Sequence, residues 1–169
     1  MRHRHLFPSR LYQQHRAKFD FHEPSIVEAR RHAAEHGLDG RVRFEAANAK
    51  EIAENGFDLV TFFDCLHDMG DPRGCATHMR RILKDDGTWM LVEPAAGDTP
   101  KDNMNPVGRL YYNASTMICV PTSLDQEIGA ALGAQAGEKK LTEVIGAGGF
   151  SRVRRAFTGP FNMVLEARA

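Results

Sequence analysis

The chain has 169 residues, 42% of them hydrophobic, and 22 basic residues balance 22 acidic ones. This length suits one domain and is short for two. With zero net charge the chain lacks the positive surplus that binds nucleic acid or an anionic membrane, so we predict neither partner.

The cysteines and the apolar runs exclude further classes. Three widely spaced cysteines without a CxxC pair do not form a disulfide framework or a typical zinc motif, and free thiols favour a cytoplasmic location. No apolar run approaches the roughly 20 residues that span a bilayer. Residues 1–16 are polar and rich in His and Arg, and we predict an irregular segment there.

The first half of the chain alternates strand and helix patterns. The predicted elements are a strand over 17–21, a helix over 24–36, strands over 41–46 and 57–63, a helix over 72–83, a turn over 85–87 and a strand over 88–93. The 57–63 strand is apolar on both sides, which is typical of a parallel sheet covered on two faces.

The second half opens with a segment of different texture. Residues 97–137 combine a polar loop, an amphipathic stretch and a Gly/Ala-rich stretch, and we predict a helical insertion in a domain that covers 17–169. A helix over 138–147 and two strands over 152–157 and 161–167 follow. Together these elements predict an α/β fold with a mainly parallel sheet.

Residues at the carboxyl ends of the strands are the candidates for ligand binding, because ligands bind there in open α/β sheets. Asp20 and Phe21 stand at the end of the first strand, and a carboxylate can accept both hydroxyls of a ribose. Asn48 and Ala49 follow the second strand, where an amide can meet an adenine edge. A helix-capping Asp20 and an ordinary loop Asn48 are the alternatives.

A denser cluster follows the 57–63 strand. Phe63 is succeeded by Asp64, Cys65, His67 and Asp68. Asp64 is suited to receive an ammonium group, and His67 is a candidate general base because its usual pKa lies near neutrality. A structural hydrogen bond is the alternative role for His67. We predict no metal site, because these residues straddle a strand-to-helix junction and no other His/Cys cluster is near in sequence.

Several stretches in this order resemble class I S-adenosylmethionine-dependent methyltransferases. The runs FDLVTFFDCLHDMGDP and LKDDGTWMLVEP resemble that family's fourth-strand and fifth-strand motifs, and FDFHEPSIVEARRHAAEHGLDGRVRF resembles its second strand, following helix and third strand. The stretches NPVGRLYYNASTMICVPTSL, ALGAQAGEKKLTEVIGAGGF and FNMVLEARA are similar to a bacterial subgroup that often carries a winged-helix-like N-terminal domain. The resemblance covers about residues 19–169.

The resemblance implies a Rossmann-like sheet with an antiparallel C-terminal strand, S-adenosyl-L-methionine as cofactor and a small-molecule methyl acceptor. Asp20 matches the acid that binds the cofactor ribose, with Phe21 beside it. Asn48 and Ala49 match the adenine-contacting loop, although the family more often has Asp at the position of Asn48. Asp64 matches the residue near the methionine moiety, and Phe63, Cys65 and His67 lie alongside it.

One feature of the family has no counterpart. Its first strand ends in a glycine-rich loop that lets the backbone approach the cofactor, and this chain has no glycine before Gly37. We therefore predict a domain that lacks its first strand and loop. The two strand edges left unpaired would close up, recruit residues 4–14 or pair with a second copy as a homodimer.

Two other functions stay open at this stage. A truncated remnant or interaction module without turnover is favoured by the missing loop, and an upstream sequence with the strand and loop in frame would indicate a miscalled start instead. A nicotinamide-dependent oxidoreductase shares the acid after its second strand, but it also needs the glycine loop.

Overall fold

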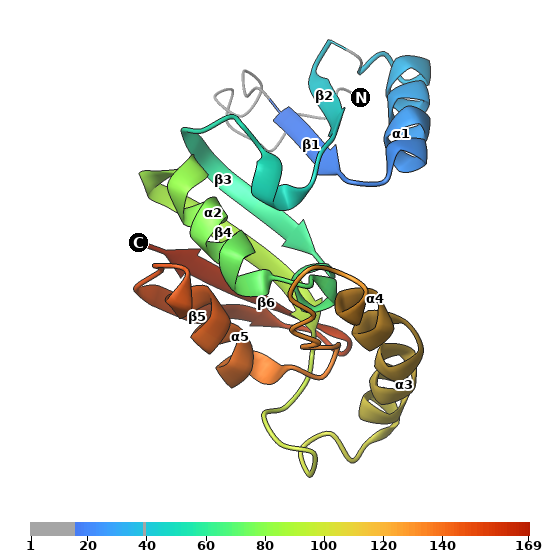
Figure 1. The fold of residues 1–169 in the computed structure, drawn as a ribbon, viewed down its shortest axis with the longest axis vertical. Helices are drawn as coiled ribbons and strands as arrows, with labels where there is room; N and C mark the ends of the chain where they lie inside the picture. Colours follow the sequence, from blue (N-terminus) through green and yellow to red (C-terminus); the bar gives the residue numbers. More distant parts are fainter. Residues whose placement is uncertain (1–15, 39) are drawn as a thin grey trace, which may run out of the picture. The chain divides into compact units, whose positions relative to one another are not determined.

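The computed structural model describes residues 16–38 and 40–169, so the segment predicted to be irregular, 1–16, lies outside the described residues except for Arg16. The chain divides into two compact units, 1–53 and 54–169, each described by itself. The described strands form a two-stranded sheet in the first unit and a four-stranded sheet in the second (Figure 1).

The first unit is a parallel β–α–β motif. Strand β1 (Arg16–Asp20) pairs in parallel with β2 (Val42–Ala46), and helix α1 (Glu23–Glu35) connects them. Helix α1 buries Ile26 and Ala33, two turns apart on one side of the helix. A short 3₁₀ helix, η2 (Ala49–Glu51), follows β2. The carboxyl ends of both strands therefore lie at the same edge of this sheet.

The second unit contains a sheet with the strand order β3-β4-β6-β5. Strand β3 (Phe57–Phe63) runs parallel to β4 (Leu83–Pro94), whereas β6 (Asn162–Arg168) is antiparallel to both β4 and β5 (Arg152–Thr158). Of these four strands only β6 runs in the opposite direction. The predicted fold class, a mainly parallel α/β sheet with an antiparallel C-terminal strand, is confirmed.

Helices α2 (Pro72–Ile82) and α5 (Gly137–Ala147) cover one face of this sheet (Figure 1). Burial alternates along β4, so that Trp89 and Leu91 have no exposed surface. The Trp89 ring lies edge-on to Phe62, with 5.1 Å between ring centroids, and 5.3 Å from Phe150. Aromatic contacts of this kind add to the stabilisation that apolar burial provides.

The contact between the two helices requires a small residue. A Cβ at Gly148, just beyond α5, would lie 2.4 Å from the Cβ of Ala76 in α2. A separation this short is a steric clash, so the end of α5 reaches α2 only because residue 148 is glycine.

The opposite face of the sheet is exposed at β3, where the sequence predicts that it is covered. Strand β3 was expected to be covered on both faces, yet Leu59 and Phe63 are 54% and 58% exposed. The prediction is wrong for this strand because α2 and α5 both pack on the side of Phe62. A smaller correction concerns the turn predicted over 85–87, since β4 runs without interruption from Leu83 and shifts its register against β3 instead.

The predicted insertion contains a bent helical stretch. Helix α3 (Pro106–Ala114) continues into a π-helical turn, η4 (Ser115–Cys119), and then into α4 (Val120–Leu124). The Asn105 side chain accepts a hydrogen bond from the N–H of Gly108 and caps α3. Within the part of the chain that the structure describes, no helix is both long and apolar enough to cross a membrane.

Candidate active site

The carboxyl end of β3 leads into a tightly held turn. Asp64 has a backbone φ of 47°, in the left-handed region that few residues other than glycine adopt. Its N–H donates to the carbonyl of Val92 at 2.8 Å, and its Oδ1 accepts a hydrogen bond from Nδ2 of Asn162, also at 2.8 Å. The turn is therefore fixed by β4 and by β6.

A buried carboxylate lies next to this turn. Glu93, near the end of β4, has no exposed surface, and its Oε1 accepts the N–H of Leu66 at 3.0 Å. Nδ1 of His67 donates to its Oε2 at 2.5 Å. His67 lies in a 3₁₀ turn, η3 (Leu66–Asp68), and is only 4% exposed. Because an ionised carboxylate only accepts hydrogen bonds, Glu93 places the imidazole proton on Nδ1 and leaves Nε2 as the basic nitrogen.

The electrostatic setting of His67 combines burial with three nearby carboxylates. Burial alone would lower the pKa of His67, because it disfavours the imidazolium. The hydrogen bond to Glu93 and the negative charges of Glu93, Asp68 and Asp64 outweigh it, so the pKa is raised. Oδ1 of Asp68 lies 3.2 Å from Nε2.

The thiols beside His67 stay protonated at neutral pH. Burial, followed by the charge of Glu93, raises the pKa of Cys65 to about 12. Burial and a hydrogen bond with Asp68 raise the pKa of Cys119 to about 11. Since the thiolate is the reactive form, neither residue has the character of a catalytic nucleophile.

A segment of the insertion, residues 123–133, holds the turn around His67 in place. The Ser123 hydroxyl donates to the carbonyl of Met69 at 2.8 Å, and the Gln126 amide both donates to Asp68 and accepts from Gly70. The backbone adds bonds from Ala130 to Gly70 and from Gly133 to His67. We call this segment the clamp.

The remaining predicted site residues lie in the first unit. Asp20 ends β1, and its Oδ1 accepts the N–H of His22 at 2.8 Å. Asn48 follows β2, and its Oδ1 accepts the N–H of Lys50 and caps the turn that begins at Ala49. Asp20 and Asn48 thus share one sheet edge, as predicted, and Phe21 beside them is 76% exposed. The structure brings Phe63, Asp64, Cys65 and His67 together in the second unit.

Sequence reasoning missed two members of the second set, Glu93 and Cys119. Glu93 had a detectable signal, because the alternation of β4 places it on the same face as the buried residues Trp89 and Leu91. The sequence contains no such signal for Cys119, because only the folding of the insertion brings this residue close to Asp68.

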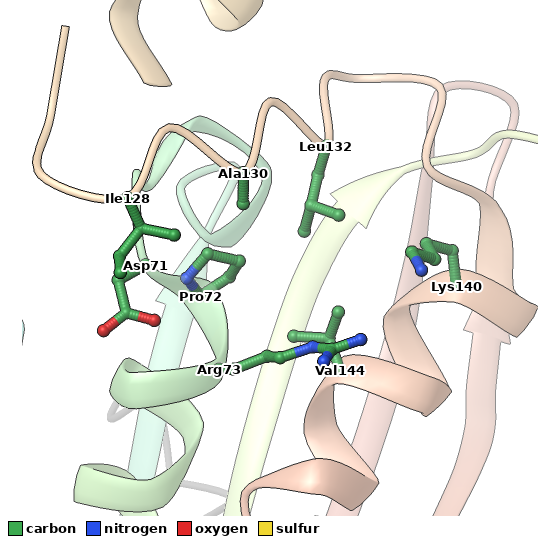
Figure 2. A pocket seen from close by; sticks show the side chains of 8 residues that line it. All are labelled: Asp71, Pro72, Arg73, Ile128, Ala130, Leu132, Lys140 and Val144. Atoms are coloured by element: carbon green, nitrogen blue, oxygen red, sulfur yellow. The ribbon is translucent and has the colours of Figure 1, made fainter. Parts of the chain in front are cut away.

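A separate cavity of about 270 Å³ lies between the start of α2, the 128–132 stretch and α5 (Figure 2). Ile128 and Leu132 from the loop and Val144 from α5 give its lining an apolar part, and Arg73 extends from α2 toward α5. Arg73 is paired there with Glu143 at 2.9 Å. None of the predicted site residues lines this cavity.

The sequence matches one protein family over most of its length. A family described as a methyltransferase domain matches residues 9–149. The chain belongs to this methyltransferase family. Among curated proteins, none matches its sequence.

Solved structures share the methyltransferase fold. An O-methyltransferase family protein from Burkholderia thailandensis matches with a TM-score of 0.67 and 21% identity, over 93% of this chain and 44% of that one. PigF, solved with SAH, matches with a TM-score of 0.70 and 14% identity, over 91% and 43%. The O-methyltransferase NcsB1 from neocarzinostatin biosynthesis, in complex with S-adenosyl-L-homocysteine and 1,4-dihydroxy-2-naphthoic acid, has a TM-score of 0.66 and 19% identity, over 90% and 41%. This methyltransferase chain thus spans less than half the length of each.

Proposed function

We propose that this chain transfers a methyl group from S-adenosyl-L-methionine to a small-molecule acceptor, with His67 as the general base. The observation that carries the proposal is the buried His67–Glu93 pair at the carboxyl end of β3, beside Asp64. In an α/β sheet this is the end where ligands bind. The membership of a methyltransferase family supplies the reaction class.

The cofactor, when bound, supplies an electrophilic methyl group on a sulfonium. Asp20 would accept the ribose hydroxyls, because a carboxylate has acceptor capacity beyond its bond to His22. The Oδ1 atom of Asn48 caps the turn, so its amide nitrogen would be the group that contacts the adenine. Phe21 and Ala49 would contact the cofactor beside it. Phe63, Asp64 and Cys65 would contact the methionine moiety.

His67 acts on the acceptor. A hydroxyl or ammonium group of the acceptor must lose a proton before its lone pair can attack the methyl carbon, and Nε2 of His67 would receive that proton. The carbon–sulfur bond would break as the new bond forms, and the sulfur would leave as a neutral thioether. Glu93 stabilises the imidazolium that results and holds the ring in position. Positioning of the two reactants contributes the rest of the rate enhancement.

The role of His67 as general base is tested with a variant that changes which ring nitrogen carries the proton. In Glu93→Gln the amide keeps an oxygen for the N–H of Leu66, but its NH₂ group then faces Nδ1 of His67. The imidazole proton must move to Nε2, which can no longer accept one. We expect kcat to fall by about 10²–10⁴-fold, with an unchanged affinity for the cofactor.

The assay needs a panel of phenolic, amine and carbon-acid acceptors and a matched control. Glu143→Gln makes the same chemical change at an exposed site and should keep full activity. An active Glu93→Gln enzyme would refute the role of His67. A folded wild-type chain that methylates none of the panel would favour the alternative, a remnant without turnover.

The cofactor site is tested by titrating the full chain with S-adenosylhomocysteine. We expect saturable binding that Asp20→Ala weakens at least about tenfold, the equivalent of 1.4 kcal/mol. Glu23→Ala removes a carboxylate near the same strand end and should not change the affinity. If the folded wild-type chain does not bind the ligand, the proposed cofactor residues do not suffice.

The three free cysteines also support a cytoplasmic location, which is a proposal of the same kind. A homodimer stays a prediction, and sedimentation at several protein concentrations checks it.

A further inference from the structure

We propose that His67, Asp68 and Cys119 form a binding site for a divalent metal ion of the zinc type. One donor atom from each residue lies within 4.8 Å of the other two. Imidazole nitrogen, carboxylate oxygen and thiolate sulfur are the ligands that zinc takes in proteins. His67 and Cys119 are buried, and Asp68 is half-buried and gives the site an opening to solvent.

The fold brings these residues together from two distant segments. His67 and Asp68 belong to η3, and Cys119 is the last residue of the π-helical turn η4. Such turns are rare and are found frequently at functional sites. The clamp holds the two segments against each other through the bonds from Ser123 and Gln126. The three donors therefore occupy a fixed arrangement.

An unsatisfied oxygen points to a cation at this place. Oδ1 of Asp68 is buried without a hydrogen-bond partner among the described residues, although Nε2 of His67 is 3.2 Å away. In the neutral tautomer that Glu93 selects, with the imidazole proton on Nδ1, a lone pair of Nε2 faces a lone pair of Oδ1 across that distance. A buried acceptor in this position calls for an unseen ion or water. A metal ion between the two atoms would satisfy both.

The surroundings match those of metal-binding histidines. A histidine that binds a metal through one nitrogen almost always donates its other N–H to a carboxylate or carbonyl, as His67 does to Glu93. When Sγ of Cys119 bonds to the ion, its proton leaves to solvent. The thiolate and the Asp68 carboxylate then balance the two positive charges of the ion, which reduces the cost of burying it.

The distances require a modest adjustment. Metal–ligand bonds of about 2.0–2.3 Å place the ligand atoms of a tetrahedral site roughly 3.5 Å apart. The three donor atoms now lie within 4.8 Å of one another, and small rotations of their side chains would bring them to that separation. The fourth position is left for water.

Metal binding would regulate the enzyme. An ion on Nε2 of His67 prevents that nitrogen from accepting a proton, so we expect Zn²⁺ to inhibit methyl transfer and a chelator to restore it. This consequence rests on the proposed function. The binding of the ion does not, and it is measured without cofactor or acceptor.

The experiment titrates the full chain with Co²⁺, which substitutes for Zn²⁺ and absorbs light. We expect one equivalent to produce tetrahedral visible bands and a near-ultraviolet thiolate-to-cobalt band, and Zn²⁺ to displace them. Cys119→Ser should abolish the near-ultraviolet band, and Asp68→Asn should weaken binding at least about tenfold. Cys65→Ser, a matched change in the neighbouring loop, should alter neither.

Two results would overturn the proposal. One is a wild-type chain whose spectrum does not change with Co²⁺, and the other is a thiolate band that survives in Cys119→Ser. If that variant does not fold, X-ray absorption of the wild-type chain with Zn²⁺ gives the answer. A shell with one sulfur at about 2.3 Å supports the site, and a shell of oxygen and nitrogen alone refutes it.

Discussion

The two compact units differ in how they hold the residues that we propose for function. In the first unit Asp20 and Asn48 are exposed, each bonded to a backbone N–H two residues away in sequence, and burial is limited to a few side chains such as Ile26 and Ala33. In the second unit His67 and Glu93 are buried and fixed by bonds across the fold. Residues held as in the first unit can be substituted without loss of structure, whereas substitutions at residues held as in the second unit also affect stability.

The largest effect on stability is expected in the core of the second unit. Trp89→Ala removes a ring without exposed surface that packs between Phe62 and Phe150, and we expect the free energy of unfolding to fall by about 3–5 kcal/mol. Urea unfolding followed by circular dichroism measures it. The control in the first unit is Val27→Ala, at a side chain that is 55% exposed, with an expected change within about 0.5 kcal/mol. Equal losses in both variants would contradict the contrast between the units.

An intermediate effect on stability is expected where the clamp meets the candidate active site. Ser123 is fully buried, and its hydroxyl donates to Met69 and accepts the N–H of Ala131. Ser123→Ala leaves both groups without a partner and should cost about 1–3 kcal/mol. It should also lower kcat, because the turn that carries His67 is loosened. Thr116→Ala removes an exposed hydroxyl in η4, and a loss as large there would show that the clamp has no special role.

The prediction of the fold from sequence succeeded where the pattern is local. The apolar run of β3, the proline at the start of α2 and the glycines after α5 each fix an element within a few residues. The same reasoning located Asp64 and His67, because a strand end can be read from its own sequence. Alternation in β4 contained the signal for Glu93.

The remainder depends on contacts between distant segments. Whether β3 is covered on one face or two is decided by where α2 and α5 pack. The π-helical turn and the approach of Cys119 to Asp68 result from the clamp, whose partners are far apart in sequence. The prediction that no metal site exists used neighbouring residues alone, whereas the site that we propose also uses Cys119, which is distant in sequence.

The smallest effect on stability is expected at an exposed charge cluster around Glu143, which lies outside the candidate active site and the proposed metal site. Lys140, through a hydrogen bond and its charge, and Arg73 lower the pKa of Glu143. A carboxylate with a lowered pKa in the folded state adds stability above its unfolded pKa, and this is lost as the pH falls through the folded value. The urea midpoint of Glu143→Gln should lie slightly below that of wild type at pH 7, and the two should coincide in strong acid. A difference that does not shrink with added salt would contradict an ionic origin.

The clamp also has a consequence for the order in which the protein folds. Its side-chain bonds to the active-site turn join residues 54 to 58 positions apart, so they close a long loop. Closing such a loop reduces the entropy of the chain before the contacts that offset this cost have formed. Contacts between residues far apart in sequence therefore slow folding. During synthesis, β3 and β4 are complete well before the clamp leaves the ribosome. A chain interrupted before residue 123 would keep the strands that flank the turn carrying His67 and would lack the segment that shapes this turn.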